Sequence, residues 1–299
     1  MKIYEKNTPD DFNKDNILKH LDEFIQLYKE RPIKNNGGGM KFPHMLGFYF
    51  LLKTLKPEFV VESGIFKGQS TWLIENTLPK TKVLSIDTSL EQREYISKSS
   101  LIEYSNLDFI NQNFNILPKN SLVFFDDHQN FYERLVYSFF FGFKHIIGED
   151  NYPVIQGDTY SFKKIYSGSG LNDVRPSLKK LLKSLIILSK HTFFKKIKKN
   201  YKREIQKYDL SIQDVLETKN HFNNLEKIID TYFEFPPVFK NKLTRWGDLW
   251  TDENYPTKEA LLDLTAANIE KYKDIYNESN SYNWMCYVKL KWKRSYSFQ

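Results

Sequence analysis

Carboxylates and a histidine that could hold a metal ion or move a proton stand in two short groups. Asp126, Asp127 and His128 follow one apolar run directly, and Glu149 and Asp150 follow the next. If both runs are neighbouring strands of one sheet, their carboxylates meet at one edge and repel one another. A hard divalent cation bound by oxygen atoms is the usual way to neutralise such a group. The alternative is helix capping, because Asp127 could cap a helix that opens near Gln129.

A second group of residues is typical of a site for a nucleoside. Glu62 ends an apolar run, a turn with Gly64 and Gly68 follows, and Asp87 ends the next apolar run, 25 residues after Glu62. Glycines let a backbone approach a ligand closely, and the helix after Gly68 begins with free N–H groups. A carboxylate at the position of Asp87 can accept both hydroxyl groups of a ribose. The alternative is a tight turn and a helix cap without a ligand.

The elements that position these residues alternate between short apolar runs and helical patterns. We predict strands at 58–62, 82–87, 107–110, 121–125, 144–148, 231–235 and 283–290, and helices at 69–77, 90–98, 131–141 and 258–272. Strands that alternate with helices indicate a parallel sheet with right-handed crossovers. The predicted fold is Rossmann-like α/β, with a mostly parallel seven-stranded sheet flanked by helices. Ligands of such folds bind at the carboxyl ends of the strands, near the switch point of the strand order.

Three segments surround or interrupt this pattern. Residues 1–56 form an N-terminal helical extension, with helices expected at 11–30 and 43–55 and a glycine run, 37–39, between them. The α/β domain comprises 57–160 and 231–299, and 161–230 is a basic helical insert or cap. No internal repeats are visible in the insert.

The positive charge of the chain is local. The net charge is +7, but residues 179–207 alone contain eleven Lys or Arg residues and one acid, Glu204. That segment is therefore net +10 and the remainder of the chain net −3. This pattern argues against a nucleic-acid surface spread over the protein and for one basic arm. The apolar residues at 178–188 could let the arm, 178–207, lie on an anionic membrane surface, or pack on the domain or on a second subunit of a homo-oligomer.

Composition excludes several other classes. The 299 residues, 40% of them hydrophobic, are enough for a full core. A single cysteine, Cys286, rules out an internal disulfide framework and a cysteine-based zinc cluster. The polar start of the chain lacks the pattern of a signal peptide, and no apolar run reaches the length of a membrane span. We expect a soluble cytoplasmic protein, or one peripheral to the inner face of a membrane.

The residues from Val60 to Thr71, followed by Ser85-Ile86-Asp87, resemble the first two motifs of class I S-adenosylmethionine-dependent methyltransferases. A dinucleotide site of the Rossmann type would have a further glycine. The resemblance covers about 57–150. It implies the class I methyltransferase fold and a cofactor site in which Asp87 binds the ribose of S-adenosylmethionine. The residues implied around the cofactor are Glu62, Gly64, Gly68, Gln69, Ser70 and Asp87.

The two acidic groups are similar to those of metal-dependent sugar O-methyltransferases of the macrolide and cephalosporin-hydroxylase-like group. The similarity implies that Asp127, Glu149 and Asp150 hold magnesium, with Asp126 as a possible substitute for Asp127. It also implies that His128 is the general base, and Asp126 is the second candidate for that role. This chain differs from those relatives, which have two residues between the second Asp and the His.

These motifs predict methyl transfer from S-adenosylmethionine to an oxygen, most simply a sugar hydroxyl of a glycan, with a divalent cation. A sugar hydroxyl is a poor nucleophile that needs a base and a polarising metal. One alternative is a nucleic-acid methyltransferase that uses the basic arm, although no recognised nucleic-acid motif supports it. The other is a non-catalytic binding module on the same fold.

Overall fold

The computed structural model describes residues 3–154, 156–168, 212–241, 243–244, 247–279 and 282–291. The strands are β1 (Phe59–Ser63), β2 (Lys82–Ile86), β3 (Ile102–Ser105), β4 (Ser121–Phe125), β5 (His145–Gly148), β6 (Ile229–Glu234) and β7 (Cys286–Leu290). The helices are α1 (Lys14–Lys19), α2 (Leu21–Lys29), α3 (Phe42–Leu55), α4 (Gln69–Thr77), α5 (Phe131–Phe141), α6 (Phe162–Ser167), α9 (Ile212–Ile228), α10 (Ala266–Lys271) and α11 (Lys273–Ser279). Two 3-10 turns, η1 (Leu90–Gln92) and η2 (Phe109–Asn111), follow β2 and β3.

The strands form one sheet in the order β3-β2-β1-β4-β5-β7-β6. Pairing is parallel from β3 to β5, and among the described strands only β7 runs against the others, between β5 and β6. The chain moves outward from β1 to β3, then returns to β4, so the order reverses between β1 and β4. This is the doubly wound pattern of a Rossmann-like fold, and the predicted fold class is confirmed.

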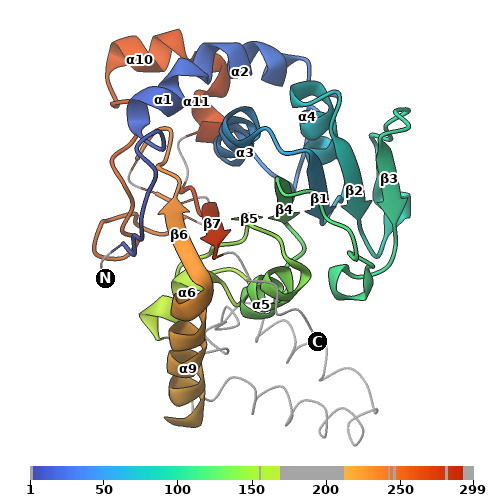
Figure 1. The fold of residues 1–299 in the computed structure, drawn as a ribbon. Coiled ribbons are helices and arrows are strands. Elements are labelled where there is room, and N and C mark those ends of the chain that lie inside the picture. Colours follow the sequence, from blue (N-terminus) through green and yellow to red (C-terminus); the bar gives the residue numbers. More distant parts are fainter. Residues whose placement is uncertain are drawn as a thin grey trace, which may run out of the picture.

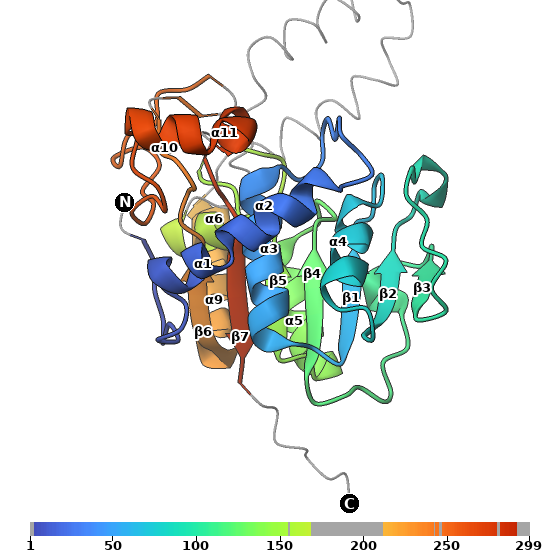
Figure 2. The same ribbon diagram turned by 90° about the horizontal axis from the view of Figure 1, so that it is seen from above.

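Helices cover both faces of the sheet, as Figures 1 and 2 show. One face carries α1 to α4 with α10 and α11, and the other carries α5, α6 and α9. Each face has its own hydrophobic cluster: Phe48 of α3 stacks on Phe124 of β4 in the first, and Leu135 and Ile146 lie in the second. Every residue of β4 is buried, because it is central and covered on both sides.

The N-terminal helices contribute directly to the first of these clusters. Nearly all of α3 is buried, from Phe42 to Leu52, and α3 contacts both α2 and α4. An apolar helix without a polar face is expected in this interior position. The predicted helix at 11–30 is in fact two, α1 and α2, which meet at His20.

Three predicted elements are wrong. The third strand lies at Ile102–Ser105 rather than 107–110, where the buried Phe109 instead packs against Phe125 and Phe143. Residues 93–98 are not helical: Glu94 and Tyr95 donate their N–H groups to the carbonyl of Lys67. Helix starts only at Ala266, capped by Thr265, in the segment predicted as 258–272.

Only the two ends of the predicted insert, α6 and α9, are described. They pack against each other and against α5 on one face of the sheet. The predicted basic arm, 178–207, lies outside the described residues. Among the described helices none has the length and apolar character needed to cross a membrane.

Candidate cofactor and metal site

A cavity of about 400 Å³ opens at the carboxyl ends of β1, β2 and β4. It lies where the strand order reverses, which is where ligands of doubly wound sheets bind. The size is within the range of small-molecule sites. Lining residues come from the first glycine run, the ends of these strands, the 3-10 turns and α5; they include Gly38, Gly39, Ser63, Gly64, Phe66, Asp87, Ser89, Asp108, Asp126, Asp127, His128 and Arg134.

Both predicted glycines of the first turn have left-handed backbone angles, with φ +97° at Gly64 and +94° at Gly68. A Cβ atom on Gly64 would lie 2.0 Å from the carbonyl oxygen of Asp126, and one on Gly68 would lie 2.5 Å from that of Tyr95. Both glycines therefore permit a close approach between two loops of the protein. Only Gly64 also lines the cavity.

Asp87 holds the turn and faces the cavity. Its Oδ2 accepts hydrogen bonds from the backbone N–H groups of Ile65 and Phe66, each at 2.9 Å, and its Oδ1 accepts one from Ser89 at 2.9 Å. A carboxylate has about four acceptor positions. Three are filled from the protein, and the side chain still borders the cavity.

Glu62, Gln69 and Ser70 do not line the cavity, and neither does Gly68. Glu62 is fully buried and accepts hydrogen bonds from Thr71 and Ser85, each at 2.6 Å. Burial raises the pKa of Glu62, and these hydroxyl groups together with Ser70 oppose the rise. Gln69 and Ser70 are buried as well, each 3% exposed.

Asp127 is already neutralised within the protein. It accepts a hydrogen bond from Ser63 at 2.7 Å and forms an ion pair with Arg134 at 2.9 Å. Arg134, which is 4% exposed, also makes two hydrogen bonds to Asp108, at 2.8 and 2.7 Å. The sequence analysis did not identify Arg134 as the ion-pair partner of Asp127, or Asp108 as the second partner of Arg134. The signal for Arg134 was a lone cation on the amphipathic helix that follows Asp127.

Glu149 is also neutralised, by residues far away in sequence. His44 of α3 binds Glu149 Oε1, and the indole N–H of Trp284 donates to Oε2 at 3.1 Å. Burial alone would raise the pKa of Glu149, but the charge of His44 and the bonds from His44 and Trp284 outweigh it, so the pKa falls to about 2. Both carboxylate oxygens are occupied, which leaves little capacity for a metal ion.

Asp126, Asp150 and His128 are the residues that the structure brings together. One potential ligand atom of each lies within 4.8 Å of the others. Desolvation and the charges of nearby acids raise the pKa of Asp126, and desolvation and Glu149 raise that of Asp150. Asp150 Oδ2 accepts a hydrogen bond from the backbone N–H of His128 at 3.2 Å, whereas Oδ1 is buried and has no hydrogen-bond partner among the described residues. This group differs from the predicted set of Asp127, Glu149 and Asp150.

His128 stands at the mouth of the site, with its side chain about half exposed and its backbone left-handed at φ +53°. Its Nδ1–H donates to Asp158 at 2.9 Å, which leaves Nε2 unengaged by that bond. The Asp158 bond, opposed by burial and aided by the charge of Asp150, raises the pKa of His128 to about 9. The pairing of Asp158 with His128 had no signal in the sequence.

No protein-family model and no curated protein matches the chain. Solved structures similar to it include CmcI with SAH (16% identity, 50% of this chain and 82% of that chain, TM-score 0.35). Others are the O-methyltransferase from Bacillus cereus in complex with SAH (15%, 62% and 82%, 0.34) and the plantazolicin methyltransferase BpumL with SAH (13%, 95% and 92%, 0.35). Identities and TM-scores this low do not place the chain in a family.

Proposed function

We propose that this chain is an S-adenosylmethionine-dependent O-methyltransferase that acts with a divalent cation on a sugar hydroxyl. The observation that carries the proposal is the cavity at the switch point. Three residues line this one cavity: Asp87, which could bind a ribose, Asp126, which could bind a cation, and His128, which could act as a base. Donor, cation and acceptor would therefore meet in a single site.

The cavity suits the chemistry of this cofactor. S-adenosylmethionine carries a ribose diol, a sulfonium and an ammonium group, and when bound it supplies an electrophilic methyl group. Four carboxylates line the cavity, from Asp87, Asp108, Asp126 and Asp127, against one guanidinium, from Arg134. An acidic cavity favours a cationic ligand. Asp87 has one acceptor position left, enough for one hydroxyl group of the diol.

Asp126 and Asp150 are the residues proposed to hold the cation. Their carboxylates are close together, and no described residue makes a hydrogen bond to the buried Oδ1 of Asp150. Two carboxylates and neighbouring oxygens suit magnesium or manganese. When bound, the cation supplies a positive charge that makes a coordinated hydroxyl more acidic.

His128 is proposed as the general base. Because Asp158 engages Nδ1, the atom that would take the proton of the acceptor hydroxyl is Nε2. At a pKa of about 9 the imidazole is mostly protonated at neutral pH. A positive charge held by Asp126 and Asp150 would oppose that protonation, because like charges disfavour each other.

The test is calorimetric titration of the protein with S-adenosylhomocysteine, with and without magnesium or manganese. We expect binding in both cases. Asp87→Ala should weaken it at least about tenfold, because hydrogen bonds to a charged group contribute about 1.5–3 kcal/mol each. Since Asp87 also holds the turn, Asp108→Asn serves as the matched control for loss of a cavity carboxylate. Absence of binding to the folded wild-type chain would remove the proposal.

A further inference from the structure

Three consecutive residues at the end of β5 differ in what surrounds them. The Glu149 carboxylate is bound by His44 and Trp284. Asn151 is 2% exposed and belongs to a separate network of polar side chains. The N–H of Asn151 also donates to the carbonyl of Glu149 at 3.0 Å, which makes the segment a tight turn. Between these two fixed neighbours, Asp150 keeps one buried oxygen, Oδ1, that has no hydrogen-bond partner in the described part of the chain.

The network around Asn151 is a closed ring of hydrogen bonds. The side-chain amide of Asn151 donates to the Tyr232 hydroxyl at 2.9 Å, and that hydroxyl donates to Glu234 at 2.7 Å. Glu234 pairs with the ammonium of Lys163 at 2.6 Å, and the backbone N–H of Lys163 returns to Asn151 Oδ1 at 2.9 Å. The ring ties the end of β5 to β6 and to α6.

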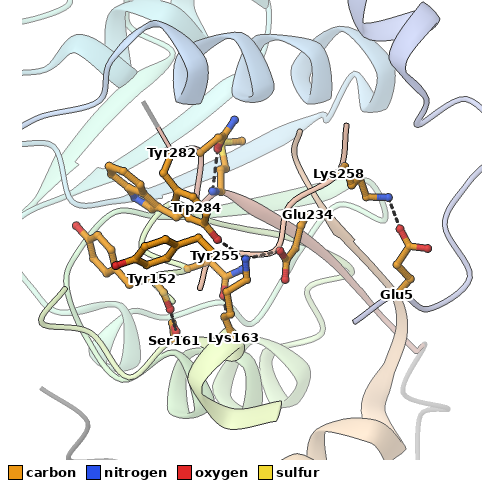
Figure 3. A network of polar contacts seen from close by, with 12 residues as sticks. Glu5, Tyr152, Ser161, Lys163, Glu234, Tyr255, Lys258, Tyr282 and Trp284 are labelled. Atoms are coloured by element: carbon orange, nitrogen blue, oxygen red, sulfur yellow. Dashed lines mark hydrogen bonds and ion pairs between the residues drawn. The ribbon is translucent and has the colours of Figure 1, made fainter. Parts of the chain in front are cut away.

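Lys163 extends the ring toward the start of β7, where it donates to the Tyr282 hydroxyl at 2.5 Å. Figure 3 shows Lys163 between Glu234 and Tyr282, with Tyr152 and Trp284 close by. Lys163 is 1% exposed and Glu234 is 5% exposed. A buried ion pair gains little stability over apolar residues of similar size, so its geometry rather than its energy is the more informative feature.

We propose that Asn151 is a positioning residue, fixed by Tyr232 and Lys163, that presents Asp150 to a divalent cation. This inference rests on the proposed function, and it assigns Glu149 to the same supporting role rather than to the ligand set. Residues behind a ligand typically change metal affinity 10–100-fold when they are altered. Because Glu149 and Asn151 are both held, the backbone turn that carries Asp150 is held as well. The ring would therefore fix where the Asp150 carboxylate lies relative to the cation.

The test measures the affinity of the full chain for manganese by calorimetry in Asn151→Ala and in a matched control, Asn283→Ala. Asn283 is 4% exposed; its side-chain amide donates to the Pro236 carbonyl and its Oδ1 accepts from the Met285 N–H, so neither bond reaches Asp150. We expect manganese affinity to fall 10–100-fold in Asn151→Ala and to stay within about twofold in the control. Affinity for S-adenosylhomocysteine should stay unchanged in both.

A second pair covers the case in which Asn151→Ala does not fold. Tyr232→Phe removes only the hydroxyl that joins Asn151 to Glu234, and Tyr287→Phe removes a buried hydroxyl bonded to His145. Only the first should lower manganese affinity. Equal affinities in test and control would overturn the positioning role, whereas a wild-type chain that binds no manganese would instead contradict the metal part of the proposed function.

Discussion

At the scale of single residues, the acids of the site differ in whether the protein neutralises them. Arg134 neutralises Asp127 and His44 neutralises Glu149. Among the described residues, only His128 offers Asp126 or Asp150 a cation nearby. The sequence indicates that acids gather at these strand ends. It cannot indicate which of them is neutralised, because His44 is 105 residues from Glu149.

This difference predicts which carboxylate controls cation binding. Asp150→Asn should abolish the rise in melting temperature that magnesium or manganese gives the wild-type chain, because a ligand that binds only the folded state stabilises it. Asp127→Asn should lower the melting temperature in the absence of metal, since Arg134 loses one partner, yet keep the metal-dependent rise. Thermal unfolding of both variants with and without the cation measures this rise. If Asp127→Asn loses the rise and Asp150→Asn keeps it, Asp127 is a ligand, as in the set predicted from the sequence.

The role of His128 gives a second prediction at this scale. His128→Gln should lower kcat for methyl transfer about 10²–10⁴-fold, the usual contribution of a general base. Affinity for S-adenosylhomocysteine should remain unchanged. Manganese affinity, measured on the same variant, separates a base from a third metal ligand, because only a ligand would lower it strongly. A fully active variant would move proton acceptance to Asp126.

At the scale of elements, strongly patterned segments could be predicted and context-dependent ones could not. The buried strands β1, β4 and β5 and the helices α3, α4 and α5 follow from apolar runs and periodicity. The third strand was predicted in the wrong place because β3 is a half-buried edge strand with a weak apolar pattern. The more apolar segment around Phe109 instead belongs to an aromatic cluster. Irregular segments such as 93–98 depend on contacts with distant backbone, which periodicity does not record.

The turn between β1 and α4 predicts an unequal response of two glycines that share a left-handed conformation. Gly64→Ala should destabilise the protein by roughly 3 kcal/mol or more, because strain adds to a clash with the Asp126 carbonyl. Gly142→Ala, at φ +93° with no described atom within 4 Å of its Cβ position, should cost about 1–2 kcal/mol. Chemical denaturation measures both, and equal losses would show that the close approach is relieved elsewhere.

The pairing of β5 with β7 predicts a pH effect on stability. Burial, with the charges of Lys144 and Lys289, lowers the pKa of His145 from 6.5 to about 4. The unfolded chain therefore binds a proton more readily between these values, and stability falls as the pH drops from 6.5 to 4. His145→Gln should remove about 2 kcal/mol of this dependence. Urea unfolding at pH 7 and pH 4.5 measures this dependence, with His20→Gln as the control. If the free energy of unfolding of His145→Gln changes with pH as much as that of the wild type, the prediction is wrong.

At the scale of the whole molecule, the sequence could predict where the site lies but only part of what forms it. The strand order brings Gly64, Asp87, Asp126 and His128 to one edge of the sheet, as their places at strand ends predict. Arg134, Asp158 and His44 enter from a helix, a loop and the N-terminal region, and their contacts depend on packing. The helices before β1, predicted as an extension, share a core with the sheet and supply His44.

The first described residues of the chain lie along the outer strand of the sheet. Lys6 forms an antiparallel bridge with Tyr232 of β6, and the ring of Tyr4 packs among Phe162, Phe222 and Tyr232. An uncovered edge strand is a template on which another molecule can add its own strand. By covering part of the β6 edge, these residues should hinder another molecule from pairing with it. A chain shortened to begin at Asn7 should keep its fold yet aggregate more readily, and light scattering would reveal this.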